Sequence, residues 1–318
     1  NKIITRLNEI ITIAGVARNF AGNVVDQARV KYKVTRTRWE RPLPWWKWWG
    51  FIPFEQPQII DQGMAETDAF GKFFIPFNAK VKPGTDLNKE EVSYTFSIEV
   101  DVTDFTGETR SNSFTTRIGN KNLVLKSNLS ETQDRDSLKE FIISATDLND
   151  SKISANGQVE LHKLVQDRNI YRKRFWSQPD QYIIPESDYK KWFPTDVYKD
   201  EDKIPLWKTE KIILNTGFKS EIPVKLNGLP HPGIYKLIAR AKDAYNQETI
   251  YETYFWVNDA KNKVYPKNEP LLSIQNTSKL QPGQELTYSI ITKLNPQYVI
   301  QNSSFSNDFK WIVSDGSV

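Results

Sequence analysis

The stretch from Tyr94 to Thr116, YTFSIEVDVTDFTGETRSNSFTT, constrains the possible fold of this chain more than any other. Its first half alternates apolar and polar residues with a period of two, which is typical of a strand with one buried face. Asp104 and Gly107 then supply turn chemistry, because Asp bonds the local backbone and Gly accepts a positive φ. The β-branched residues from Thr109 onward predict a returning strand. We therefore expect a β-hairpin here.

A second copy of this hairpin occurs later in the chain, as GIYKLIARAKDAYNQETIYETYFWV. Asp243 stands where Asp104 stands in the first copy. Asn246 takes the place of Gly107, three residues after the Asp in each case. Asn is the residue that best replaces Gly in a left-handed conformation. Two matching hairpins predict two tandem copies of one β domain.

The beginnings of the two segments also match, at an offset of about 128 residues. The run from Ala17, ARNFA, parallels the run from Ala145, ATDLN. The next predicted strands parallel one another in the same way, Val30, Tyr32 and Val34 with Val159, Leu161 and Lys163. Regularly spaced short strands with turn signals between them favour antiparallel β-sandwiches.

These patterns predict an all-β chain of tandem antiparallel β-sandwiches of the immunoglobulin or prealbumin type. We expect the first domain over residues 9–119 and the second over residues 121–260. Residues 265–318 predict a partial or small third β domain, because LQPGQELTYSIITKL resembles one more opening strand. The length of 318 residues suits two or three domains.

An aromatic insertion over residues 167–207 interrupts the second predicted domain. Within it, PESDYKKWF predicts a short helix with Ser187 as N-cap and Pro194 as its stop. The alternation that follows the insertion predicts one strand through four apolar residues: Phe218, Ile222, Val224 and Leu226.

Composition excludes several classes of function. Lys and Arg (43) nearly balance Asp and Glu (39) and are interspersed, so no basic block exists to bind nucleic acid. The absence of Cys excludes disulfides, thiolate metal sites and a Cys nucleophile within this chain. No apolar run is long enough to span a membrane. The sequence starts at Asn1 without a signal-peptide pattern, and we expect it to be a piece of a longer chain.

No arrangement of residues predicts catalysis, a cofactor or a metal site, and we expect a protein that is not an enzyme. The two histidines, His162 and His231, fall on a predicted strand and in a turn, where structural roles are expected. The acidic runs 147–150 and 200–202 lack the glycine and the ligand spacing of a calcium loop, so solvated turns are expected. Catalytic signatures such as GxSxG, HExxH or a Walker sequence are absent.

Two aromatic loops are the unusual feature of the sequence. The first holds Trp45, Trp46, Trp48 and Trp49, among prolines that disfavour a helix or a central strand. The second is the insertion over residues 167–207, which includes Trp176 and Trp192. These six tryptophans are the candidate interface or ligand-binding residues of the chain.

Two interpretations of these loops remain open. Exposed Trp rings stack on sugars or anchor protein interfaces, which would make the chain a cell-surface module that binds glycan or protein. Alternatively the rings fold back to cover a sheet or fill the joint between domains, because soluble proteins rarely expose such a patch. We favour the second interpretation, since both repeats insert aromatic residues at the same place.

The order of motifs resembles a known family. ARNFAGNVVDQARVKYKV, then ETDAFGKFFIPF, then the VDVTDFTGETR hairpin is similar to the macroglobulin-like domains of bacterial alpha-2-macroglobulins, in particular large Bacteroidetes-type members. The second copy is similar, with KDAYNQET in the turn and an insertion around Trp192. The resemblance covers roughly residues 9 to 260. The opening segment also resembles carboxypeptidase regulatory-like modules, but two copies and the start of a third favour the macroglobulin family.

The resemblance implies an exported trap for proteases, whose body changes conformation after a bait segment is cut. In many members an internal thioester between Cys and Gln then captures the protease, and residues 1–318 cannot contain it because they lack Cys. No functional residue of the family is therefore carried onto this chain. The implied role is a non-enzymatic scaffold that contributes to proteinase binding or inhibition, in the periplasm or at the cell surface. Its expected partners are neighbouring domains and a proteinase.

Overall fold

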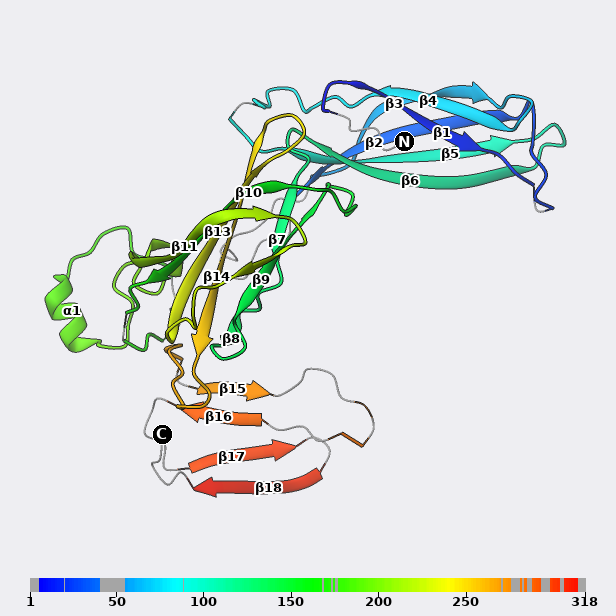
Figure 1. The fold of residues 1–318 in the computed structure, drawn as a ribbon. Helices are drawn as coiled ribbons and strands as arrows, with labels where there is room; N and C mark the ends of the chain where they lie inside the picture. The colour runs from blue at the N-terminus through cyan, green and yellow to red at the C-terminus, as the bar shows by residue number, and fades with distance from the viewer. Residues whose placement is uncertain are drawn as a thin grey trace.

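The computed structural model has an all-β fold with one short α-helix (Figure 1). Nearly all strand pairs are antiparallel, and the short strand β8 runs parallel to β14. The residues described are 6–19, 21–40, 55–87, 89–167, 169–172, 174, 177–269, 271–275, 281, 283–284, 288–292, 298–303 and 306–313.

The first unit of the fold consists of six strands in two sheets. They are β1 (Ile10–Val16), β2 (Arg29–Trp39), β3 (Gln58–Glu66), β4 (Lys72–Asn78), β5 (Ser93–Thr103) and β6 (Thr109–Gly119). One sheet has the order β3-β2-β5-β6, and β1 pairs with β4 in the other. Alternate residues such as Val34, Ile75 and Ile98 are fully buried between the sheets, as the period of two predicts.

The second unit repeats this plan with additions. Its elements are β7 (Val124–Ser127), β8 (Thr132–Asp134), β9 (Glu140–Thr146), β10 (Asn156–Leu164), α1 (Glu186–Trp192), the short 3₁₀ helix η2 (Ile204–Leu206), β11 (Thr209–Lys219), β12 (Pro223–Lys225), β13 (Gly233–Lys242) and β14 (Glu248–Asn258). The sheets are β11-β10-β13-β14-β8 and β12-β9-β7. Strands β9 to β14 thus occupy the places that β1 to β6 occupy in the first unit. β7 and β8 have no counterpart among the described residues of the first unit.

The two hairpins have the turn geometry that the sequence predicts. In β5–β6 the Asp104 carboxylate accepts hydrogen bonds from the backbone N–H of Thr106 (2.8 Å) and Glu108 (3.0 Å). In β13–β14 Asp243 holds the matching backbone groups of Tyr245 and Gln247. Gly107 has φ +88°.

Asn246, which replaces Gly107 in the second hairpin, has φ +64°. The left-handed turn position predicted for both residues is therefore confirmed.

The β1–β2 and β9–β10 turns match residue by residue at the predicted offset of 128. Arg18 bridges Val24 in the first, and Thr146 bridges Lys152 in the second. The side chains of Asn19 and Asp147 each accept a hydrogen bond from the backbone N–H four residues on, at 3.0 and 2.8 Å. The repeat is therefore encoded by turn residues as well as by the hairpins.

The alignment of the second strands was wrong by two residues. β2 places Tyr32 beside Val100, and β10 places Val159 beside Ala239, which is the counterpart of Val100 in the repeated hairpin. Val159 therefore corresponds to Tyr32 and not to Val30. The stretch from Lys152 to Val159 is one residue shorter than the stretch from Val24 to Tyr32, and alternation alone does not reveal such a shift.

Two further expectations in the second unit were wrong. Pro185 is the N-cap of α1 and no side chain caps the helix, so Ser187 lies within the first turn. Phe218 and Val224 belong to different strands, β11 and β12, in opposite sheets. The chain turns between them at Glu221, which has φ +65°. A turn without Gly or Pro gave no signal in the sequence.

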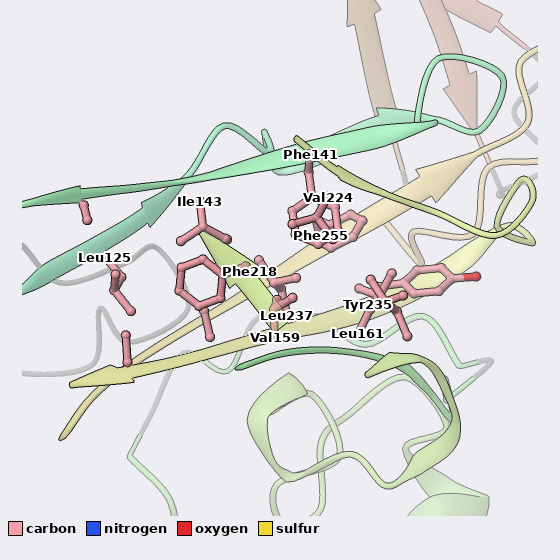
Figure 2. Packing of buried hydrophobic residues seen from close by; sticks show 14 of the residues in the cluster. Leu125, Phe141, Ile143, Val159, Leu161, Phe218, Val224, Tyr235, Leu237 and Phe255 are labelled. Carbon is pink, nitrogen blue, oxygen red and sulfur yellow. The ribbon is translucent and has the colours of Figure 1, made fainter. Parts of the chain in front are cut away.

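The core of the second unit lies between its two sheets (Figure 2). Phe141 and Ile143 of β9 face Leu237 of β13 and Phe255 of β14, and Tyr235 stacks on Phe255 with ring centroids 5.7 Å apart. Leu125 of β7 lies in the same core and is 2% exposed. A strand without counterpart in the first unit therefore contributes directly to this core.

The last part of the chain forms two hairpins in the residues that the structure describes. They are β15 (Leu271–Gln275) with β16 (Tyr288–Thr292), and β17 (Tyr298–Ser303) with β18 (Ser306–Val313).

Gly157 of β10 tests the packing of strands in the second unit. A Cβ added there would overlap the backbone carbonyl oxygen of Arg240 and lie 2.8 Å from the Phe218 ring. We expect Gly157→Ala to reduce the free energy of unfolding by about 1–3 kcal/mol, measured by urea denaturation. Gly217→Ala is the matched control, because its added Cβ would lie 3.8 Å from its nearest neighbour. Equal stability of the two variants would contradict this packing.

Candidate functional site

The structure places only one of the six candidate tryptophans. Five of the six lie outside the described residues. Four of these are in residues 41–54 (Trp45, Trp46, Trp48 and Trp49), and the fifth is Trp176 in the insertion. Trp192 is the last residue of α1 and is 60% exposed. The prediction that these residues contribute to an interface or bind a ligand is therefore not tested.

The described part of the aromatic insertion is anchored on the outer face of the large sheet of the second unit. Trp207 packs edge to face on Trp256 of β14, with ring centroids 6.4 Å apart, and its indole N–H donates to the Glu201 carbonyl at 2.8 Å. Leu164, Ile234 and Tyr254 complete this cluster. Trp207 thus covers a sheet face, the role that the second interpretation of the aromatic loops assigns.

Four rings of the insertion form an aromatic cluster beside α1: Tyr182, Tyr189, Phe193 and Tyr198. Tyr198 is its buried centre, 4.8 Å from Tyr182 and 5.2 Å from Tyr189 between ring centroids. The Tyr198 hydroxyl donates to the Ile184 carbonyl at 2.8 Å. These contacts order a segment that has little regular secondary structure.

The aromatic cluster lines a hollow of about 330 Å³. Arg172 pairs with Asp196, and Arg174 donates to the Val197 carbonyl at 2.8 Å, so both guanidinium groups already bind protein atoms. Trp192 does not line this hollow. The hollow therefore presents aromatic and aliphatic surface, and the Arg172 and Arg174 side chains in its wall bind neighbouring protein groups.

A joint between the two units is the best-defined polar constellation that the structure describes. The Asn149 side chain bonds both backbone groups of Arg117, accepting from its N–H (2.8 Å) and donating to its carbonyl (3.1 Å). The Arg117 guanidinium donates to the Leu148 carbonyl at 3.1 Å and to Asp150 at 2.9 Å. It also lies 5.2 Å from the centre of the Trp39 ring.

The chain between the units is held at the same joint. Asn122 donates its backbone N–H to Asp243, the turn residue of the second hairpin, at 3.1 Å. Arg6 of the first unit lies 3.5 Å from the centre of the Tyr245 ring of the second. The turn loops of the second unit therefore form its contact surface with the first.

Sequence reasoning treated residues 147–150 as a solvated acidic turn and missed this joint. Asp147 does serve the turn, but Leu148, Asn149 and Asp150 serve the contact between units. The signal available in the sequence was Leu148, an apolar residue at the tip of a polar turn. It is 1% exposed in the structure.

The remaining candidate chemical groups have structural roles. His162 on β10 contacts Glu160 (2.9 Å) and Thr209 (3.2 Å), and the bond to His162 holds the pKa of Glu160 below its usual value. The His231 carbonyl accepts from the Tyr235 hydroxyl at 2.7 Å. Among the described residues, no three acidic or histidine side chains gather as a metal site would require. None of the helices described is long and apolar enough to cross a membrane.

Comparison with known proteins gives structural likeness at low similarity. Neither a family model nor a curated protein matches the sequence. The native form of E. coli alpha-2-macroglobulin is 12% identical with a TM-score of 0.33, over 98% of this chain and 20% of that chain. The same protein activated by porcine elastase is 14% identical with a TM-score of 0.30, over 94% and 24%.

A tetra-tandem repeat from the extending region of a large adhesion protein is 10% identical with a TM-score of 0.22, over 98% of this chain and 61% of that chain. This chain spans about a fifth of the native E. coli structure. These TM-scores are too low for the likeness to carry an argument. The fold described above defines the chain as a tandem β-sandwich protein.

A clasp at the start of the insertion gives a pH-dependent prediction. The Tyr171 hydroxyl donates to Asp167 at 2.6 Å, and burial together with this bond raises the pKa of Tyr171 to about 12. Because the folded pKa is raised above the usual value of about 10, the clasp is complete below pH 10 and is lost as pH rises through 12. We expect the difference in tyrosinate absorbance between wild type and Tyr171→Phe to appear near pH 12. A difference centred near pH 10 would contradict the clasp, and circular dichroism controls for unfolding.

Proposed function

We propose that this chain is a non-enzymatic structural segment that holds successive β-sandwich domains in a fixed arrangement within a larger exported protein of macroglobulin type. The observation that carries the proposal is the joint between the two units. Only four residues, 120–123, separate β6 from β7. A flexible tether would leave these residues in solvent, whereas here their backbone and side chains bind both units.

Asn120 illustrates how the short connection is fixed. Its side chain accepts from the Val92 N–H at 3.0 Å and donates to the carbonyls of Leu87 (2.9 Å) and Glu90 (2.7 Å). Asn122 binds the second unit through the bond to Asp243 and through its side-chain oxygen, which accepts from Leu148 N–H at 3.3 Å. Adjacent anchor points on both sides favour a rigid joint over a hinge.

Removing the Asn149 amide tests the rigidity of the joint. Asn149→Ala loses both bonds to Arg117, which contribute about 1 kcal/mol each. We expect a broader distribution of distances between the units, measured by double electron–electron resonance with spin labels at Phe105→Cys and Ile250→Cys. Both label positions are exposed, and the chain has no other cysteine.

Asp150→Asn is the matched control for this experiment. It keeps a residue suited to the positive φ of 61° and removes only a charge pair in which the Asp150 side chain is exposed, worth less than about 1 kcal/mol. Its distance distribution should match that of the wild type. A wild-type distribution as broad as that of Asn149→Ala would contradict a rigid joint.

Proteinase binding is the finer part of the proposal and depends on the motif resemblance to bacterial alpha-2-macroglobulins. One solved neighbour is an alpha-2-macroglobulin activated by porcine elastase, which is a property of that protein. In this proposal the present chain supplies architecture and the periplasm or cell surface is its location. The Bacteroidetes type of the family remains a prediction from the motifs.

An inhibition assay tests proteinase binding separately from the scaffold role. We expect the full-length protein containing this chain to suppress elastase activity on a large protein substrate while cleavage of a small peptide substrate continues. Residues 1–318 alone should suppress neither activity. Full activity on both substrates in the presence of the full-length protein would refute proteinase binding and leave the joint experiment unaffected.

The alternative function, a surface module that binds glycan or protein through its aromatic loops, has one structural observation in its favour. The insertion exposes Ile183 (90%), which lines the aromatic hollow, and Trp192 (60%) at the end of α1. Trp207, however, folds back onto the sheet. We therefore place this function second.

A further inference from the structure

A long groove opens between the two sheets of the first unit. It has a volume of about 710 Å³ and lies between β1 and the hairpin β5–β6. Its floor is apolar and includes Ile13, Phe73 and Val100. Within the described residues β1 pairs with β4 only, so the edge of β1 that borders the groove carries no neighbouring strand.

The second unit has a strand at the corresponding place. β7 pairs antiparallel with β9, the counterpart of β1, from Val124 opposite Thr146 to Ser127 opposite Ile143. Leu123 (1% exposed) and Leu125 (2%) fill the space between the sheets. The repeated unit is therefore complete only where a strand occupies this position.

Contacts of β7 identify which groove residues would meet such a strand. The Tyr251 hydroxyl lies 3.1 Å from Ser127 Oγ, and Thr249 donates to the Leu123 carbonyl at 3.3 Å. The hairpins correspond at an offset of 139, since Thr103 pairs with Thr109 as Lys242 pairs with Glu248. The counterparts of Tyr251 and Thr249 are thus Asn112 and Arg110, and both line the groove.

The exposure of the residues beneath β7 differs from that of their counterparts in the groove of the first unit. Ala239 and Ala241 of β13 are 0% and 4% exposed under β7. Their counterparts in the first unit, Val100 and Val102, are larger and only partly buried. Covering apolar side chains of this size removes apolar surface from water, which is favourable.

The backbone of β1 is oriented to accept a strand. Odd-numbered residues bond toward β4, since Ala17 donates to Gly71 and Glu9 accepts from Ala79. Alternation then directs the backbone groups of Ala14 to the open edge. Its counterpart in β9, Ile142, donates to the Asn128 side chain (2.8 Å) and accepts from the Asn128 N–H (3.2 Å) next to β7.

We infer that the groove is the seat of one further β-strand, supplied by the same polypeptide ahead of Asn1 and added antiparallel to β1. The offset of 128 residues places the counterpart of β7 there. Residues 6–9 cannot supply the strand because they bind elsewhere: Leu7 is buried in the core, and Asn8 donates its N–H to Ala79. The occupant is an extended segment with apolar residues at alternate positions, as in Leu123 and Leu125. This inference is independent of proteinase binding.

Photo-crosslinking in the full-length protein tests the inference. Phe114 lines the groove and is 53% exposed, so Phe114→p-benzoylphenylalanine places a crosslinker of similar shape there. We expect an intramolecular crosslink to the segment directly ahead of Asn1, identified by mass spectrometry of the monomer. The control is Phe105→p-benzoylphenylalanine, which is 92% exposed in the turn and outside the groove, and should not give this crosslink.

A crosslink from position 114 to a second copy, to another protein or to no segment at all would overturn the inference. Hydrogen exchange on the unsubstituted full-length protein gives a second measurement that does not depend on folding of a variant. The Ala14 amide should be protected to within about tenfold of the Ile142 amide, which donates to the Asn128 side chain directly after β7, because both amides would be hydrogen-bonded at this edge. Much faster exchange at Ala14 would show that the edge of β1 is open.

Discussion

The structure depends on one local interaction that recurs in both units, in which an Asp or Asn side chain accepts hydrogen bonds from the backbone N–H groups that follow it. Asp68, Asp104, Asp147 and Asp243 each hold the N–H two and four residues later. The residue three positions after the Asp takes a positive φ, as Gly107 does after Asp104. Such a turn closes without long-range help, so each of these four connections is fixed by a short segment of sequence.

The parts of the fold that could be predicted from sequence are those fixed by this local chemistry. The hairpins and the unit repeat depend on Asp-x-x-Gly spacing and on alternation, both of which are visible in one chain. The strand alignment of β10 and the end of β11 could not be predicted, because a one-residue difference between loops and a positive φ at Glu221 leave no pattern. The N-cap of α1 was missed for a similar reason, since Pro185 supplies geometry without a capping side chain.

The candidate site was less predictable than the fold because its residues serve two surfaces at once. Asn149 belongs to a turn in sequence and to a joint in space, and only the position of Arg117 in another unit reveals the second role. Trp207 and Trp192 belong to the same insertion, yet one covers the sheet and the other faces solvent. The aromatic composition of the insertion marked it as unusual. Whether a given ring packs on the sheet or faces solvent depends on tertiary packing, which the sequence does not show.

The position of β7 has a mechanical consequence. The chain enters the second unit at Val124, beside the joint, and leaves β14 at Asn258, at the opposite end of the sandwich (Figure 1). Tension along the chain would pull β7 parallel to its own axis and load all its bonds to β9 together. Bonds loaded in shear resist force collectively, whereas bonds opened one at a time yield in sequence. A pull applied between Val124 and Asn258 would therefore load the β7–β9 pair in shear.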